Sequence, residues 1–350
     1  MAAKERSAED AKIGAQQVEA AKPAARWVDV KSEVARKLIE AMEKGETPWQ
    51  KPWNSQALQP RNPVTGNGYR GINRILLSLA GGNGMWVTYQ QARTQGWRVR
   101  EGEKGTMIVK VVDLDPRPKR EGESAPGGGG AETVKREKQS APRNVALRHY
   151  YVFGAHQIDG MPVLEPPCEL DFHPVEKAES ILSAMQELTD LKITYGQREA
   201  CYLPALDEVR LPAKMSFKSV YDLYSVAMHE CSHATLHAKR LNRTEAIGKR
   251  WGDAAYSLEE LRAEISSAIL ASTLGIEATD EQRNKHFANH VGYLQSWIKA
   301  IHKDPIAIFS AAKDAEQMAE YIMGIERKKS AMAEHSEWIA EYDATAVVAR

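Results

Sequence analysis

Residues 219–240 read S-V-Y-D-L-Y-S-V-A-M-H-E-C-S-H-A-T-L-H-A-K-R and contain the pattern His-Glu-x-x-His at positions 229–233. The stretch holds neither glycine nor proline, and apolar residues lead directly into the pattern, so the sequence predicts a helix. Residues four apart share one face of a helix, and His229 and His233 can therefore bind one metal ion. Glu230 lies one step around, where it can hold a water on the metal and accept its proton as general base.

A metal site of this kind needs a third protein ligand, and a later segment of the chain offers one. His237 lies a further turn along the predicted helix and cannot reach the same ion. The stretch Y-S-L-E-E-L-R-A-E-I-S-S-A-I-L (256–270) predicts a helix with Ser257 as N-cap, and it places Glu260 and Glu264 on one face. Glu264 has the more apolar neighbours, and a buried carboxylate needs a partner. We therefore predict Glu264 as the ligand with Glu260 beside it, or the two in reversed roles.

Several features around the predicted metal site leave alternatives open. The ligand set favours Zn²⁺, with another divalent ion such as Mn²⁺ as the alternative. Tyr256, His290 and Tyr293 are candidates for a group that stabilises an oxyanion. The extended segment 200–212 predicts either an edge strand that binds a peptide backbone or a strand pair of the core. The alternative to a metal site is an ordinary pair of histidines on an amphipathic helix.

The two parts of the chain carry opposite charges although the net charge is zero: residues 1–150 have a balance of +9 and residues 151–350 a balance of −9. Residues 47–100 contain no acidic residue. Cations interleaved with aromatic side chains are typical of single-stranded nucleic acid binding, in which cations contact phosphates and rings stack on bases. The expected DNA contacts are Trp49, Lys51, Trp53, Tyr69, Arg70, Asn73, Arg74, Arg93 and Arg98. Gly66, Gly68 and Gly71 fit a G-x-G-x-x-G pattern, but no strand precedes it, so it predicts at most a backbone nest for a phosphate.

The pattern of the whole chain predicts an α+β fold in two domains. Residues 27–160 form the first, an α/β domain in which a flexible insertion at about 113–146 joins two paired strands. Residues 170–325 form the second, with a helix at 174–188, a small sheet, the histidine helix and further helices to about 324. Residues 1–26 and 326–350 are expected to be tails. The charged N-terminus, the lack of an apolar run near 18 residues and three widely spaced cysteines predict a soluble, cytoplasmic protein.

Motifs in both domains resemble one family. E-K-G-E-T-P-W-Q-K-P-W-N, G-Y-R-G-I-N and W-V-T-Y-Q-Q-A look like the N-terminal domain of the ArdC-like antirestriction proteins. A-M-H-E-C-S-H-A-T, E-E-L-R-A-E and Y-L-Q-S-W-I-K-A-I resemble the zincin-like metallopeptidase domain usually fused to it, and the resemblance spans about residues 30–325. It implies single-stranded DNA binding by the first domain, and it carries the peptidase motif over to His229, Glu230 and His233 and the third-ligand position to Glu264.

The resemblance also implies a role, which is the protection of incoming conjugative plasmid DNA from host restriction. Two hypotheses follow. In the first, a DNA-associated metalloprotease acts on a nearby protein, with host restriction or DNA-processing proteins as possible partners. In the second, the protein is a non-catalytic DNA shield or decoy whose metal is structural. Glu230 favours the first, because a purely structural site does not need a general base.

Overall fold

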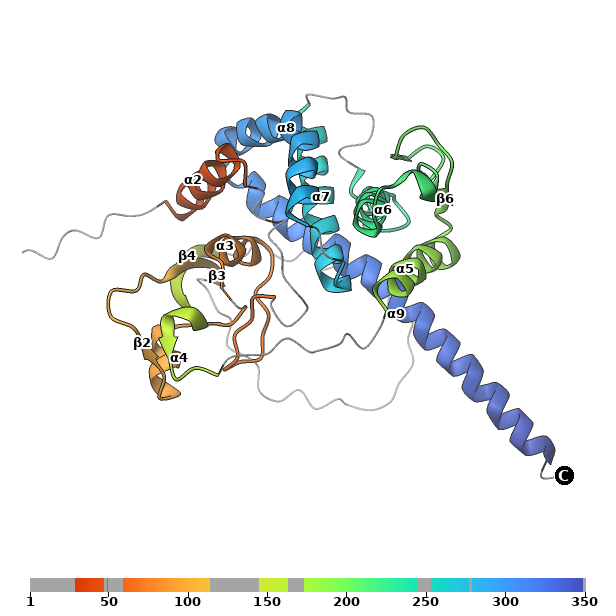
Figure 1. Ribbon diagram of the computed structural model, residues 1–350, viewed down its shortest axis with the longest axis horizontal. Coiled ribbons are helices and arrows are strands. Elements are labelled where there is room, and N and C mark those ends of the chain that lie inside the picture. Colours follow the sequence, from red (N-terminus) through yellow and green to blue (C-terminus); the bar gives the residue numbers. More distant parts are fainter. Residues whose placement is uncertain are drawn as a thin grey trace, which may run out of the picture.

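The computed structural model describes residues 29–46, 49, 59–82, 84–113, 145–162, 173–244, 253–276 and 279–348. Within these residues the predicted α+β fold is confirmed: the chain combines helices with three small sheets, and helix α7 (Ala254–Leu274) lies between the strands of the N-terminal part and strand β6 (Lys192–Thr194) (Figure 1). None of the helices in these ranges is both long and apolar enough to span a membrane. The predicted tail at 1–26, most of the predicted insertion and Cys168 lie outside the described residues.

The N-terminal part combines helices with a ribbon of two long strands. Its helices are α2 (Val30–Glu43), α3 (Ile72–Ala80) and α4 (Tyr89–Thr94). Its strands are β1 (Trp86–Val87), β2 (Arg98–Val99), β3 (Thr106–Asp113), β4 (Val145–Gly154) and β5 (Ile158–Asp159). β3 and β4 are antiparallel along their length, from Thr106 opposite Val152 to Asp113 opposite Val145, and β1 adds to the other side of β4. The prediction that paired strands flank the insertion is confirmed.

The C-terminal part places a small sheet beside a group of long helices. Its helices are α5 (Pro174–Thr189), α6 (Val220–Ala234), α7 (Ala254–Leu274), α8 (Asp280–Lys303) and α9 (Ala307–Val348). Its strands are β6 (Lys192–Thr194), β7 (Cys201–Leu203) and β8 (Glu208–Arg210). The sheet has the order β6-β8-β7, with β6 parallel and β7 antiparallel to β8.

Three helix ends differ from the expectations. α6 stops at Ala234 because the guanidinium of Arg240 donates to the Ala234 carbonyl at 2.7 Å, so His237 lies in the turns beyond the helix. α7 begins after Asp253, and Ser257 lies inside it, its carbonyl accepting from the Trp297 indole at 2.9 Å. α9 continues well past residue 324, and its last turns extend away from the other elements (Figure 1).

One hydrophobic core joins the two parts of the chain. Leu38 of α2 and Ile75 of α3 pack in the same cluster as Leu261 of α7, Ile301 of α8 and Ile308 of α9, all of them almost fully buried. Burying a side chain of this kind contributes roughly 1.5–3 kcal/mol. A second core lies within the C-terminal part, between α5, the sheet, α6, α7 and α9. α7 contributes to both cores, and this fixes its position against α6.

Candidate metal centre

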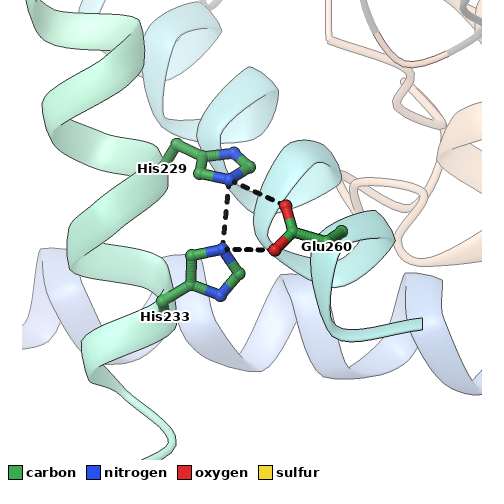
Figure 2. Close-up of side chains that lie close together, drawn as sticks. All are labelled: His229, His233 and Glu260. Atoms are coloured by element: carbon green, nitrogen blue, oxygen red, sulfur yellow. Dashed lines mark hydrogen bonds and ion pairs between the residues drawn. The ribbon is translucent and has the colours of Figure 1, made fainter. Parts of the chain in front are cut away.

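The centre lies between α6 and α7, which small side chains allow to approach closely. Ser232 of α6 and Ser266 of α7 are fully buried, and their hydroxyl groups are 2.9 Å apart. One turn away, the imidazoles of His229 and His233 point from α6 toward Glu260 of α7, as Figure 2 shows. The helix predicted from the sequence therefore presents both histidines on one face.

The three side chains have the spacing of a metal site. The Nε2 atoms of His229 and His233 are 3.1 Å apart. The nearest Glu260 oxygens lie 3.5 Å from the His229 Nε2 and 3.6 Å from the His233 Nε2. A tetrahedral zinc ion with bonds of about 2.0–2.1 Å places its donor atoms about 3.3–3.4 Å apart. Two histidines and one carboxylate therefore fit a single divalent ion and leave a fourth position open.

Glu264 lies on the other side of His229. Its carboxylate is 3.6 Å from the Nδ1 atom of His229, on the ring edge that faces away from His233 and Glu260. The preferred prediction of Glu264 as the third ligand does not fit this geometry, whereas the reversed roles do. Glu260 and Glu264 are four residues apart on α7, so which of them faces both histidines depends on how far α7 is shifted along α6. The local sequence does not determine this shift.

A third glutamate, Glu259, holds the second histidine. Its carboxylate lies 3.5 Å from the Nδ1 of His233 and accepts from Arg243 at 2.5 Å. Each imidazole thus presents Nε2 to the centre and Nδ1 to a buried carboxylate, an arrangement that fixes ring orientation in metal sites. The sequence analysis did not single out Glu259 or Arg243. The Glu259-Glu260 pair was the available signal, because adjacent helical residues can flank one side chain from two directions.

The electrostatics of the centre favour positive charge. Burial alone would lower the pKa of His229, but hydrogen bonds to Glu260 and Glu264 outweigh it and raise the pKa well above the ordinary value. Burial would also lower the pKa of His233, but hydrogen bonds to Glu259 and Glu260 outweigh it and raise the pKa to about 9. Burial would raise the pKa of Glu260, yet the two histidines hold it below its usual range. Carboxylates directed at this point would stabilise a bound cation in the same way.

Glu230 is placed differently from the other glutamates. It is 8% exposed, and within the described part of the chain it makes no hydrogen bond or ion pair. Tyr256 and Tyr293 are hydrogen-bonded to each other, and Tyr256 also bonds Glu260, so both predicted tyrosines border the centre. The side chain of His290 lies outside what the structure describes.

Two of the predicted DNA contacts have structural roles instead. Trp49 is 4% exposed and packs edge-on against Trp297 with ring centroids 5.7 Å apart, so its ring cannot stack on a base. The Asn73 amide pairs with both backbone groups of Val109, at 2.7 and 2.8 Å, and so satisfies the free edge of β3. Tyr69 is half-buried, and its hydroxyl contacts Asn62 and the Trp86 carbonyl.

The glycine-containing loop before α3 does bind an anion, but this anion is a carboxylate of the same chain. Glu316 of α9, only 8% exposed, accepts from the Gly71 backbone amide at 3.0 Å and lies 2.7 Å from the Arg74 guanidinium. Gly71 has φ of +56°, which favours glycine at this position. Arg70 is exposed and paired with Glu320. Of the predicted phosphate nest, the Gly71 amide is therefore taken up by a carboxylate at the joint between the two parts of the chain.

The remaining predicted contacts stay predictions. Arg93 and Arg98 are exposed, and neither has an ion pair with another described residue. Lys51 and Trp53 lie outside the described residues.

Comparisons with known proteins agree with this architecture. The family model of the N-terminal domain of anti-restriction factor ArdC matches residues 28–153, and that of a zincin-like metallopeptidase matches residues 176–314. The Mn(II)-bound crystal structure of the antirestriction ArdC protein from plasmid R388 is 30% identical, with a TM-score of 0.62 over 85% of this chain and 98% of that chain. Its metal-free structure is 29% identical, with a TM-score of 0.64 over 86% of this chain and 98% of that one.

Curated relatives show the same similarity in longer and shorter proteins. A DNA primase TraC of Escherichia coli is 39% identical over 85% of this chain, which spans 20% of that primase. The uncharacterized protein y4eC of Sinorhizobium fredii is 30% identical over 84% of this chain and 91% of its own length. With the two family models in this order and ArdC matched over almost its full length, the chain belongs to the ArdC-like antirestriction family, with an ArdC N-terminal domain followed by a zincin-like domain.

Proposed function

We propose that this protein protects incoming conjugative DNA from host restriction by binding single-stranded DNA through its N-terminal part and by cleaving a protein at the centre between α6 and α7. The observation that carries the enzymatic half is the geometry of His229, His233 and Glu260, with three donors on one side and Glu230 adjacent. The similarity to ArdC and the excess of cations in residues 1–150 support the DNA-binding half.

Each residue of the centre has a role in the proposed reaction. His229, His233 and Glu260 would hold a divalent ion, zinc or manganese, which supplies a Lewis acid that polarises a peptide carbonyl and acidifies water. Glu230 accepts the proton of the attacking water and passes it to the leaving amine. Tyr256 and Tyr293, on α7 and α8, are within reach of the centre to donate to the carbonyl oxygen as it gains charge.

The substrate would bind along β7. This strand pairs with β8 on one side only in the described part of the chain, so its other edge can accept a peptide backbone. β7 packs against α6, and burial together with the nearby charge of Glu230 raises the pKa of the Cys201 thiol on this strand, which supports a substrate path close to Glu230. An edge strand next to the centre favours a peptide substrate.

The test replaces Glu230 with glutamine and compares the variant with wild type in four measurements. Zn²⁺ affinity and affinity for a single-stranded oligonucleotide should be retained, while cleavage of fluorescent casein should fall by about 10³-fold or more, because the general base is lost. The fourth measurement is protection of plasmid DNA entering a restricting host. Glu281→Gln, an exposed change on α8, is the matched control.

The outcomes separate the two hypotheses. Loss of casein cleavage together with loss of protection supports a proteolytic mechanism. Protection that survives the loss of cleavage would assign it to DNA binding alone, the shield or decoy function. Casein cleavage that is unchanged in Glu230→Gln would refute the proposed reaction.

A further inference from the structure

The outer end of the β3–β4 ribbon carries two cations directly opposite each other. In the register of the two strands, Lys110 faces Arg148 and Ile108 faces Tyr150. Directly opposed residues and those two apart on a strand share one face of a sheet, so Lys110, Arg148 and Tyr150 lie together. We refer to these three residues as the ribbon face. Lys110 and Arg148 are exposed, and Tyr150 is 40% exposed.

The rest of the ribbon is used by the fold, which limits the free surface to this end. On the same face nearer the domain, Val152 is fully buried against Leu77 and Trp86, and Ile108 packs against them. On the opposite face, Val109 is buried in the core that joins the two parts of the chain, and Leu147 packs against it. The ribbon face therefore points away from that core.

The opposed cations have a cost that an anionic ligand would offset. Like charges directly across a β-ladder destabilise the strand pair. Lys110 and Arg148 form no ion pair with any other described residue, whereas Arg70 and Arg74 are paired with Glu320 and Glu316 of α9. Neighbouring phosphates bound to Lys110 and Arg148 would offset this repulsion. Tyr150, two residues from Arg148 on β4 and diagonal to Lys110 on β3, offers a ring on which an unpaired base can stack.

We propose that the ribbon face, Lys110, Arg148 and Tyr150, is the contact surface for single-stranded DNA, in place of the glycine-containing loop before α3. This inference rests on the proposed DNA-binding function and adds its location. The cations contact successive phosphates, and Tyr150 stacks on a base. The same chemistry does not suit a protein partner as well, because the surface offers repeated positive charge without an apolar centre.

Charge reversal gives a test in which binding and stability move in different directions. Lys110→Glu and Arg148→Glu each create an opposite-charge pair across the strands, so the midpoint of thermal unfolding should stay the same or rise. Affinity for a fluorescein-labelled 30-nucleotide oligo-dT, measured by anisotropy with the full chain, should fall about tenfold or more in each variant. The slope of log affinity against log salt should decrease by about 0.7 for each lost phosphate contact.

Two further variants make the test specific. Tyr150→Ala should weaken binding by about fivefold to 150-fold at constant salt slope, while Tyr150→Phe, which keeps the ring, should bind like wild type. Lys104→Glu changes the charge by the same amount at the other end of β3, at an exposed position without an ion pair in the described chain. Its affinity should fall much less than that of Lys110→Glu.

The results distinguish this inference from the function on which it rests. If wild type binds the oligonucleotide and the ribbon-face variants bind as tightly, the location is wrong while DNA binding stands. Equal losses in Lys104→Glu and Lys110→Glu would likewise overturn it, because net charge would explain both. If wild type does not bind the oligonucleotide, the DNA-binding half of the proposed function fails, and this inference fails with it.

Discussion

Replacing Glu260 or Glu264 by glutamine provides the sharpest test of the metal centre. Both changes remove one negative charge from the same face of α7, so their long-range effect on a cation is matched. They differ in position: Glu260 faces the Nε2 atoms of both histidines, and Glu264 faces only the Nδ1 of His229. The structure therefore predicts that Glu260→Gln removes a ligand, whereas Glu264→Gln removes only a hydrogen bond that orients His229.

The expected magnitudes follow from these two roles. Structural zinc sites with four ligands bind their ion with about 10–16 kcal/mol, so one ligand contributes on the order of 2.5–4 kcal/mol, or roughly 10²–10³-fold in affinity. Loss of a carboxylate that orients a ligating histidine typically costs about 10–100-fold. Glu260→Gln should thus weaken binding more than Glu264→Gln. Glu259→Gln, which affects the Nδ1 of His233, should resemble Glu264→Gln.

Isothermal titration of chelator-treated protein with Zn²⁺ and with Mn²⁺ measures these affinities directly. Circular dichroism of each variant checks that α6 and α7 remain folded, and Glu281→Gln on the exposed surface of α8 serves as the control. A larger loss in Glu264→Gln than in Glu260→Gln would refute the assignment of Glu260 as the ligand. Equal affinities in wild type and Glu260→Gln would show that the Glu260 carboxylate does not complete the centre.

Two further predictions concern stability. Glu326→Gln should lower the free energy of unfolding by about 1–3 kcal/mol at pH 7, because the Glu326 carboxylate is 1% exposed and accepts from Lys177 at 2.7 Å and from Ser330 at 2.8 Å. Burial would raise the pKa of Glu326, but these contacts outweigh it and lower the pKa from 4.5. The contribution of Glu326 to the free energy of unfolding is therefore complete above pH 4.5 and is lost as the pH falls through the lower pKa of the folded state. In urea unfolding, the difference in stability between wild type and Glu326→Gln should therefore disappear in acid. A difference that grows in acid would contradict this reasoning. Glu187→Gln, at an exposed position, is the control. Second, Zn²⁺ at 100 times its dissociation constant should raise the free energy of unfolding by about 2.7 kcal/mol. Because one core joins the two parts of the chain, hydrogen exchange of the most protected amides should slow in α3 and β3 as well as in α6 and α7. Slower exchange confined to α6 and α7 would show that the two parts open separately.

Features that depend on neighbouring residues in the sequence were predictable. The apolar spacing of α2 and α5 and the β-branched residues of β3 indicate helix and strand without reference to the rest of the chain. The spacing of His229 and His233 likewise determines that both imidazoles share a face. The ends of the helices were less predictable, because α6 ends where the guanidinium of Arg240 returns to the Ala234 carbonyl.

Features that depend on distant residues could not be read from local pattern. Residues 47–100 contain no acid, which suggests an uncompensated basic surface. In the folded chain, however, Glu316 lies against Arg74, although 242 positions separate them in the sequence. A window of composition cannot contain such a partner. For the same reason the sequence predicts Trp49, in a proline-containing segment, as a DNA contact, although its ring is buried against Trp297.

The opposite charges of the two parts of the chain thus serve two different purposes. Where the parts meet, acidic residues of α9 neutralise Arg70 in the loop before α3 and Arg74 in α3 itself, and the shared core holds that joint closed. α7 lies in this core through Leu261 and Ile265 while it presents Glu260 and Glu264 to the histidines of α6. The helix that builds the candidate metal centre is therefore held partly by the N-terminal part of the chain. The ribbon face, together with Arg93 and Arg98, carries exposed cations that α9 does not reach, and we propose that these attract nucleic acid.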